Sequence, residues 1–298
     1  MNYRAQFDFE IDFSNGGGIC GRDFRLDIAG DEITERELAD QLVADMRLLM
    51  VGAVRIHNKR IIVEAHKRVT FEAAVERGRY VDLSHTIQNG LSNYRGLPAP
   101  VICDYLSRKA SRLRYAAGTE FQIAKIEMVA NTGTYVDVPS HRYADGKDLA
   151  QVGVERFADL DAIVVRAQQR GSPAVGVEFF RGLDVRDRAV LVHTGWDRHW
   201  NTPHYLGEHP FLTAEAAQWL RDAGAALVGI DSMNIDDTRG NTRPVHSTLL
   251  AADIVIAEHL CNLAGVPDEG FAFSAIPPKF KGVGTFPVRA LAKLRGSG

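Results

Sequence analysis

The segment Asn131–His141 concentrates polar side chains of the kinds that carry out chemistry. It reads Asn-Thr-Gly-Thr-Tyr-Val-Asp-Val-Pro-Ser-His. In an extended strand Tyr135 and Asp137 point to the same face because they lie two residues apart, and Pro139 ends regular strand pairing. This stretch, called the signature segment below, thus brings a carboxylate and the imidazole of His141 to a strand end. Polar groups are costly there unless they are paired or used.

The signature segment resembles the motif of the cyclase family, a group of metal-dependent hydrolases that includes bacterial kynurenine formamidase and isatin hydrolase. The family motif is His-x-Gly-Thr-His-x-Asp-x-Pro-x-His. This chain matches it at Gly133, Thr134, Asp137, Pro139 and His141. It departs from it at two positions, where Asn131 and Tyr135 replace histidines.

The resemblance implies a role for each matching residue. In two-metal members of the family, the first two motif histidines and the aspartate hold one ion. The aspartate also bridges to a second ion, which a later histidine and a glutamate hold. By position, this implies Asp137 as the bridging carboxylate, His246 and Glu258 as ligands of the second ion, and His141 as the catalytic proton-transfer residue. Asn131 and Tyr135 stand where the remaining ligands are expected and become candidates for catalytic hydrogen bonding.

Such a set of side chains suits the hydrolysis of an amide. A bound metal lowers the pKa of water to about 7 and polarises the carbonyl group. A histidine can then return a proton to the leaving nitrogen, because the ordinary pKa of histidine lies near neutrality. Asp137, His246 and Glu258 would leave room for water on one divalent ion. An oxygen-rich ligand set favours manganese or magnesium over zinc.

The two replaced histidines leave three interpretations open. In the first, the chain binds one manganese, zinc or magnesium ion through Asp137, His246 and Glu258 and hydrolyses an amide. In the second, it binds no metal and is a cyclase or lyase acting on a carbonyl, polyketide-like substrate. His141, Asp137 and Tyr135 would then carry out acid-base chemistry, and Tyr135 and Asn131 would donate hydrogen bonds to an enolate or oxyanion. In the third, the chain is catalytically silent and binds a ligand or forms a complex.

Residues 1–75 are predicted to form a small α+β module ahead of the elements that position these side chains. Apolar residues alternate from Phe7 to Phe13 and again over residues 24–28, with a glycine-rich turn between them, which predicts a β-hairpin. A capping-box pattern at residues 34–37 precedes helical spacing of Leu38, Leu42, Met46 and Leu49. We expect a docking or oligomerisation role for this module.

The rest of the module is predicted from shorter patterns. Residues 54–56 and 61–63 are expected to be short strands on either side of a turn at Asn58, and residues 60–79 a charged helical connector. None of these stretches gathers histidines, cysteines or carboxylates into a convergent set.

Residues 76–298 are predicted to be the catalytic domain. Apolar runs at 189–193, 227–231 and 254–258 predict buried strands. The resemblance implies an α/β fold of the swivelling cyclase type, with a central mixed sheet and surrounding helices. The aromatic, proline-rich loop 196–210 is expected either to wall a pocket for a flat ligand or to pack at the surface.

Two further sets of polar residues are weaker candidates for the site. His85 follows the expected opening strand and is a candidate to approach the pocket. Asp231, Asp236 and Asp237 form an acidic cluster at a strand end, which we expect to be a solvated loop, with Asp231 as a candidate neighbour of the site.

Bulk composition excludes several classes of function. The 298 residues carry a net charge of −3, which gives no electrostatic basis for binding nucleic acid or an anionic membrane. No apolar run approaches the roughly 20 residues of a membrane span. Three widely separated cysteines show no disulfide or zinc-ribbon pattern, so we expect a reducing cytoplasm. The resemblance implies a small-molecule substrate and a homodimer or homotetramer.

Taken with the resemblance, these patterns predict a cytoplasmic hydrolase of a carbon–nitrogen bond in a small cyclic or formylated amide. It would use a divalent metal held by Asp137, His246 and Glu258, and His141 as general acid and base.

Overall fold

The computed structural model describes residues 2–28, 30–46, 48, 50–64, 80–91, 94, 96–168 and 172–295. The chain divides into two compact units, residues 1–70 and 71–298. No helix among these described residues is long and apolar enough to cross a membrane.

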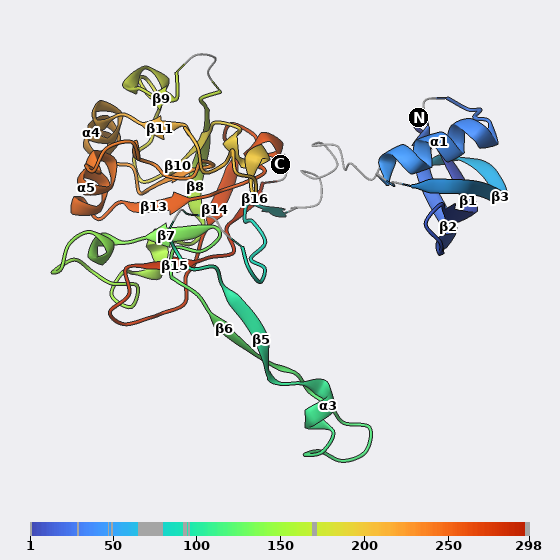
Figure 1. Ribbon diagram of the computed structural model, residues 1–298. Helices are drawn as coiled ribbons and strands as arrows, with labels where there is room; N and C mark the ends of the chain where they lie inside the picture. Colours follow the sequence, from blue (N-terminus) through green and yellow to red (C-terminus); the bar gives the residue numbers. More distant parts are fainter. Residues whose placement is uncertain are drawn as a thin grey trace. The chain divides into compact units, whose positions relative to one another are not determined.

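The first unit is a three-stranded antiparallel sheet with one helix packed against it (Figure 1). The strand order is β2-β1-β3. Phe7, Phe9 and Ile11 alternate with polar residues and are buried beneath Leu38 and Leu42 of the helix. The elements are β1 (Asn2–Phe13), β2 (Gly18–Ile28), α1 (Glu35–Asp45) and β3 (Val51–Glu64).

The elements predicted for this unit from the sequence agree with the structure in part. The hairpin of β1 and β2 is confirmed, and so is the capping box, in which Thr34 and Glu37 exchange hydrogen bonds at the start of α1. The expectation of two short strands is wrong, because β3 is continuous and absorbs the turn signal at Asn58 as a left-handed residue (φ 53°) within the strand. Residues 60–64 belong to β3 and not to a helical connector. Residues 65–79 and Leu49 lie outside the described residues.

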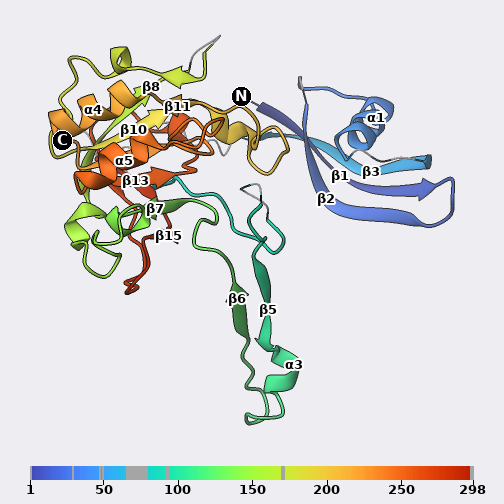
Figure 2. The same cartoon turned by 60° about the vertical axis from the view of Figure 1, so that its left-hand side comes forward.

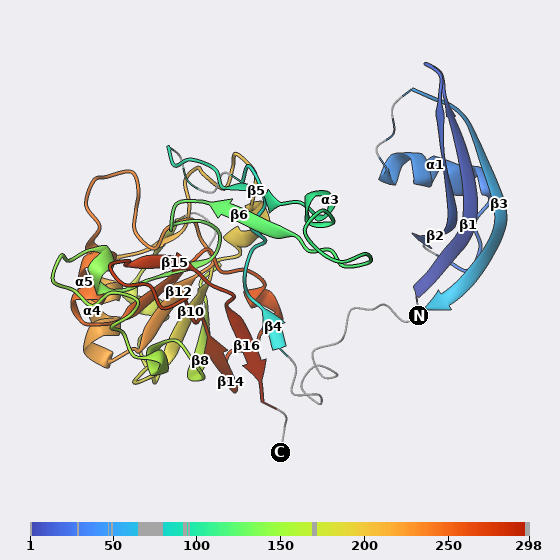
Figure 3. The same ribbon diagram turned by 90° about the horizontal axis from the view of Figure 1, so that it is seen from below.

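The second unit is built on a nine-stranded mixed sheet. The strand order is β15-β7-β13-β12-β10-β8-β14-β16-β4, and the four strands β13, β12, β10 and β8 are parallel neighbours. Figure 3 shows β14, β16 and β4 following β8 toward one edge. The strands of this sheet are β4 (Tyr80–Asp82), β7 (Tyr135–Asp137), β8 (Leu160–Arg166), β10 (Ala189–His193), β12 (Leu227–Ile230), β13 (Val255–Glu258), β14 (Phe271–Ser274), β15 (Thr285–Pro287) and β16 (Leu291–Leu294).

The remaining elements of the second unit are short. Two small strands, β9 (Ala174–Val175) and β11 (Phe211–Leu212), pair in parallel. The 3₁₀ helices are η1 (Pro139–His141), η2 (Val154–Arg156), η3 (Val177–Phe179), η4 (Trp196–His199) and η5 (Leu263–Gly265). The two helices beside the sheet are α4 (Ala214–Ala223) and α5 (Pro244–Ala251).

Apolar cores cover both faces of the sheet, as expected for strands with apolar residues at successive positions. In β13, Val255 and Ala257 enter one core, whereas Ile256 enters the other, together with residues of α4 and α5. Glu258 follows Ile256 by two residues and therefore points to the face that α5 covers. A carboxylate thus enters a layer that is otherwise apolar.

A two-stranded ribbon extends away from this sheet in all three views (Figures 1, 2 and 3). It consists of β5 (Val101–Leu106) and β6 (Ile123–Glu127), paired antiparallel, with the short helix α3 (Arg108–Ser111) toward its tip. Every residue of β6 is exposed. The ribbon carries apolar side chains into solvent, among them Tyr105 (74% exposed) and Leu113 (91% exposed).

Candidate active site

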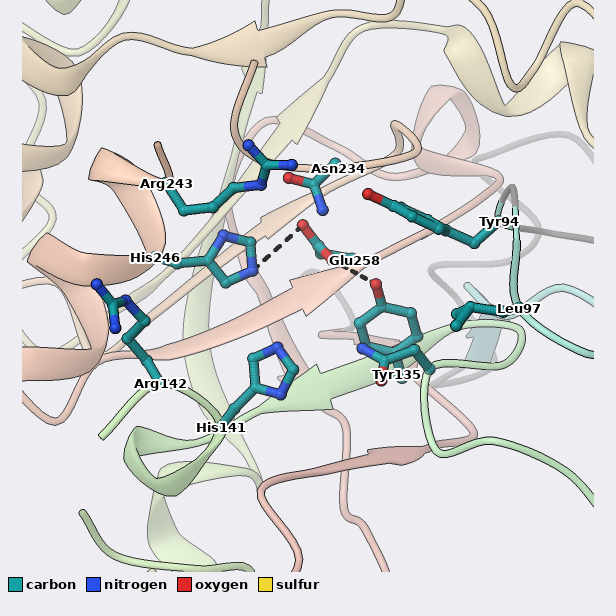
Figure 4. Close-up of a pocket in the computed structure, with 10 residues that line it drawn as sticks. Tyr94, Leu97, Tyr135, His141, Arg142, Asn234, Arg243, His246 and Glu258 are labelled. Carbon is teal, nitrogen blue, oxygen red and sulfur yellow. Dashed lines mark hydrogen bonds and ion pairs between the residues drawn. The ribbon is translucent and has the colours of Figure 1, made fainter. Parts of the chain in front are cut away.

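A pocket of about 260 Å³ opens where β7, β13 and α5 meet (Figure 4). Its lining includes Asn131, Tyr135 and His141 of the signature segment together with His246 and Glu258. Asp137 lies beneath this lining and is fully buried. The structure therefore brings together all six residues that were singled out from the sequence. The other lining residues are Tyr94, Leu97, Arg142, Asn234 and Arg243.

Strand register places the polar side chains of β7 and β13 on one face. Asp137 pairs with Ile256 and Tyr135 with Glu258, so Tyr135, Asp137 and Glu258 all point toward α5. The turn that leads into β7 requires Gly133, because its φ is +69° and an added Cβ would lie 2.6 Å from the Ile87 side chain. The small residues of the signature segment thus set the direction in which β7 begins.

Thr285 links Asp137 to His141. Its hydroxyl donates a hydrogen bond to Asp137 Oδ1 and lies 2.6 Å from His141 Nδ1. The hydroxyl has one proton and the carboxylate can only accept, so His141 Nδ1 must carry a proton and donate to Thr285. The neutral imidazole of His141 therefore keeps a free lone pair on Nε2, the atom that can accept a proton from a reacting group.

Close contact between two backbones holds Thr285 in this position. An added Cβ on Gly284 would lie 2.3 Å from the backbone nitrogen of His141, so only glycine fits there without movement of the chain. Thr285 pairs with Asp137 across β15 and β7. A strand far along the chain thus sets the orientation of the imidazole.

His246 is oriented by a buried carboxylate, Asp236. Asp236 Oδ2 lies 2.6 Å from His246 Nδ1 and also accepts from the His246 backbone N–H, while Oδ1 accepts from Val245 N–H. Asp236 therefore satisfies the first turn of α5 and fixes the tautomer of His246 at the same time. His246 Nε2 is left facing Asp137 and Glu258.

Glu258 is held by Tyr135 and by the backbone. The Tyr135 hydroxyl donates to Glu258 Oε2 at 2.5 Å, and Ile235 N–H donates to Oε1 at 2.6 Å. Asn131 makes a side-chain hydrogen bond to the same hydroxyl. Burial, and then the charges of Glu258 and Asp137, raise the pKa of Tyr135 well above its ordinary value. Tyr135 is therefore a neutral hydrogen-bond donor and not a phenolate ligand.

The remaining charges of the site are strongly coupled. Burial raises the pKa of Glu258 to about 7, although the positive charge of His246 opposes this. Burial alone would lower the pKa of His246, but Glu258, Asp137 and Asp236 raise it well above its ordinary value. Burial also opposes ionisation of Asp137, yet the hydrogen bond of His246 and the charge of His141 lower its pKa. Asp137 therefore ionises more readily than Glu258.

The donor set fits one divalent metal ion. Asp137 Oδ2 is buried, and among the described residues it has no hydrogen bond of good geometry and faces only His246 Nε2. It lies 3.5 Å from His246 Nε2, close to the roughly 3.4 Å that separates two ligands of a tetrahedral zinc ion. Within the described ranges, Asp137, His141 and His246 place ligand atoms within 4.8 Å of one another. Glu258 is outside that group, but its Oε1 lies 3.8 Å from His246 Nε2.

A second ion does not fit the first two motif positions. Tyr135 keeps its proton and directs it to Glu258, and the Asn131 side chain is bonded to the same hydroxyl. The two residues that replace the motif histidines, Asn131 and Tyr135, therefore form a hydrogen-bonded chain that ends at Glu258.

The other candidates from the sequence lie away from this pocket or differ from expectation. His85 stacks on Trp200, with ring centres 3.9 Å apart, and does not line the pocket. The loop 196–210 also lies outside the lining, and its Tyr205 bonds to buried His259. The expectation that Asp231, Asp236 and Asp237 form a solvated loop is wrong for the first two, which are fully buried. Asp231 accepts hydrogen bonds from Thr194 and Gly195.

Sequence patterns gave no indication of several residues of the site. Thr285 reaches Asp137 only through strand pairing, and no local signal marks it. Asp236 stands ten residues before His246 and well before Arg243, which holds the N-cap position of α5, so no capping signal in the sequence marks it. Arg142 follows His141 directly, but nothing in its spacing shows that it lines the pocket. The same holds for Asn234 and Arg243.

Comparison with known proteins gives consistent results. The Cyclase family model, described as "Putative cyclase", matches residues 81–237. The kynurenine formamidase of Erythrobacter litoralis is 27% identical over 205 residues, which cover 67% of this chain and 87% of the relative. The kynurenine formamidase of Bacillus cytotoxicus is 24% identical over 220 residues, which cover 74% of this chain and 99% of the relative.

Solved structures share the fold of the second unit. Isatin hydrolase A from Labrenzia aggregata has a TM-score of 0.63 at 21% identity and covers 74% of this chain and 96% of its own. Isatin hydrolase A from Ralstonia solanacearum has a TM-score of 0.62 at 22% identity, with 77% and 97% covered. A structure described as a potential metal-dependent hydrolase with cyclase activity has a TM-score of 0.59 at 23% identity, with 72% and 96% covered. The predicted α/β fold with a central mixed sheet is confirmed.

Proposed function

The chain belongs to the cyclase family, and from this premise we propose that it is an amidohydrolase that cleaves a carbon–nitrogen bond in a small cyclic or formylated amide. The similarity to proteins named kynurenine formamidase and isatin hydrolase supports this class of reaction. The former name describes cleavage of a formamide and the latter hydrolysis of a cyclic amide.

The observation that carries the proposal is the convergence of Asp137, His141 and His246, in which the buried Oδ2 of Asp137 faces His246 Nε2 at 3.5 Å. Asp137 and His246 would hold one divalent ion, with Glu258 Oε1 as the next oxygen on the same side. Manganese, zinc and magnesium are the candidates. Such an ion supplies a water of lowered pKa and polarises the carbonyl group of the substrate.

The side chains of the pocket provide the proton transfers. His141 would accept a proton from the attacking water at Nε2, because Thr285 keeps its Nδ1 protonated. The same Nε2–H would then donate to the leaving nitrogen. Asp236 holds His246 with Nε2 directed at the ion position, so the ligand needs no rearrangement on binding.

The hydrogen bonds of Tyr135 favour this hydrolase over a metal-free cyclase or lyase. Such an enzyme would need Tyr135 to donate its proton to an oxyanion of the substrate. That proton is instead directed to Glu258 Oε2 at 2.5 Å.

Assembly into a homodimer or homotetramer and a docking role of the first unit stay predictions. Light scattering of the intact chain and of a chain lacking the first unit would check both.

Elemental analysis of protein purified without chelator or immobilised nickel tests the proposal first. We expect about one ion per chain for the wild type, a large loss in Asp137→Asn and Glu258→Gln, and retention in His141→Gln. Hydrolysis of N-formylkynurenine and isatin, followed by absorbance, should be lost in all three variants.

His57, an exposed histidine of the first unit, provides the control. His57→Gln should keep both the metal and the activity. A wild-type protein that takes up no manganese, zinc or magnesium on titration would refute the metal-dependent hydrolase. Loss of metal in His141→Gln would instead make His141 a ligand.

A further inference from the structure

The pocket has a basic side and an apolar side. In the view of Figure 4, Arg142 and Arg243 are drawn on the side of His246, and Tyr94 and Leu97 on the opposite side. All five residues line the same cavity. The lining therefore offers positive charge to one end of a bound molecule and flat apolar surface to the other.

The guanidinium of Arg243 is fixed in place but is not neutralised. Its Nη1 donates to three backbone carbonyls of its own loop, at 2.7–3.3 Å, those of Asp237, Gly240 and Thr242. Within the described part of the chain, its Nε and Nη2 make no hydrogen bond and no carboxylate pairs with it. Arg239, four residues earlier, is paired with Asp237 at 2.8 Å. Arg243 thus presents a free Nε–Nη2 edge, the edge that binds a carboxylate through two parallel hydrogen bonds.

Arg142 adds a second positive charge that lacks a carboxylate partner among the described residues. Its Nε donates to Ser247 Oγ at 3.2 Å, and its side chain lies over the Tyr143 ring. Because it directly follows His141, its backbone position is fixed by the same turn that carries the proton-transfer residue.

The carboxylates of the pocket are already engaged and do not balance these charges. Glu258 accepts from Tyr135 and Ile235. Asp137 accepts from Thr285 through Oδ1, and its Oδ2 faces His246. An anionic group entering the pocket would therefore meet two guanidinium groups without displacing an existing ion pair. Placing charge opposite an unpaired partner avoids the cost of breaking another pair.

We propose that the pocket selects an amide bearing a carboxylate, which Arg243 and Arg142 bind, and a flat apolar group, which packs against Tyr94 and Leu97. This specificity rests on the proposed amidohydrolase function and names its substrate class. The carboxylate anchors the molecule at the basic side, and the reacting bond then lies between that side and Tyr135.

The test compares substrates that differ only in the carboxylate. Formanilide and the three positional isomers of N-formylaminobenzoate share the ring and the formamide, and the isomers place the carboxylate at three distances from the reacting bond. We expect one isomer to have a kcat/KM roughly 10- to 100-fold above that of formanilide, mainly through KM. In Arg243→Gln this ratio should fall toward one.

Matched variants separate recognition of the carboxylate from disturbance of the loop. Arg239→Gln removes a nearby guanidinium that is already paired and should keep the wild-type ratio. Arg243→Lys keeps the charge but loses the two-pronged edge, and should give an intermediate ratio. Circular dichroism melting checks that each variant is folded.

Two results would overturn the inference. One is equal kcat/KM for formanilide and all three isomers, and the other is an unchanged ratio in folded Arg243→Gln. If the wild type hydrolyses none of these amides, the proposed reaction is wrong. Calorimetric binding then tests the carboxylate site by itself. Tighter binding of an aminobenzoate than of aniline, lost in Arg243→Gln, would support the carboxylate site, and equal binding would refute it.

Discussion

Replacement of Asp236 by asparagine tests how far the buried carboxylate behind His246 controls metal binding. The Asp236 side chain accepts three hydrogen bonds: from Val245 N at 2.8 Å, from His246 N at 3.0 Å and from His246 Nδ1 at 2.6 Å. In Asp236→Asn an NH₂ group takes the place of one carboxylate oxygen. If the NH₂ group replaces Oδ2, its N–H bonds point at two N–H donors of His246. If it replaces Oδ1, they point at the N–H of Val245.

The magnitude follows from the contacts that are lost. A hydrogen bond to a charged group contributes about 1.5–3 kcal/mol, and a negative charge at a helix N-terminus contributes about 0.3–1 kcal/mol. We therefore expect the free energy of unfolding of the metal-free protein to fall by about 2–4 kcal/mol. Loss of such an orienting partner should also weaken metal binding by roughly 10- to 100-fold.

The assay is competition for the ion with a chromophoric chelator, combined with thermal denaturation followed by circular dichroism. Asp237→Asn is the matched control, because Asp237 is the next residue and pairs with Arg239 at the surface. An Asp236→Asn protein that is folded and binds the ion as tightly as the wild type would refute the reasoning. An equal loss in Asp237→Asn would show that the effect belongs to the loop and not to the contact with His246.

Three further predictions follow from buried contacts. Tyr135→Phe removes a donor to Glu258, so the free energy of unfolding should fall by about 1.5–3 kcal/mol while metal uptake persists, as measured by denaturation and elemental analysis. Gly284→Ala places a methyl group 2.3 Å from a backbone nitrogen of the signature segment and should cost about 1–3 kcal/mol or more, whereas Gly265→Ala enters open space and should not. Burial lowers the pKa of His85 from 6.5 to about 4, so stability present above pH 6.5 should be lost as the pH falls toward 4, by about 2 kcal/mol at pH 5.

Each of these results has a clear contrary outcome. A Tyr135→Phe protein that loses its metal would mean that the phenol supports the ligands directly. Equal stability of Gly284→Ala and the wild type would show that β15 moves freely relative to the turn. For His85, the slope of stability between pH 6.5 and 5 is the observable, because the unfolded chain takes up a proton there that the folded protein excludes. An unchanged slope in His85→Gln would contradict the assignment.

Local patterns predicted the parts of the molecule that local physics determines. The hairpin of the first unit and the capping box at Thr34 depend on neighbours in sequence, and both are present. The turn signal at Asn58 was overridden because pairing with β1 continues along the whole of β3 and accommodates one left-handed residue. The continuity of β3 through Asn58 depends on its pairing with β1, and no local pattern in the sequence indicates that pairing.

The site divides in the same way. The signature segment could be read directly because its chemistry and its turn lie within eleven consecutive residues. Asp236 and Thr285 could not, since the first acts through the start of α5 and the second through the pairing of β15 with β7. Polar residues in a loop are usually solvated, so the sequence favours a surface position for Asp236, whereas the fold buries it against His246. The free edge of Arg243 likewise depends on which carboxylates the fold leaves nearby.

The position of β7 in the sheet has a consequence for how the chain matures. Both of its neighbours, β13 and β15, come much later in the sequence, and Thr285 lies 148 residues beyond Asp137. At a synthesis rate of about 5–20 residues per second, roughly 7 to 30 seconds separate the appearance of these two partners on the ribosome. Because β13 is made before β15, Asp137 has both of its flanking strands only once β15 has appeared. The chemical centre is therefore completed among the last parts of the unit to fold, and contacts of such long range make that step slow.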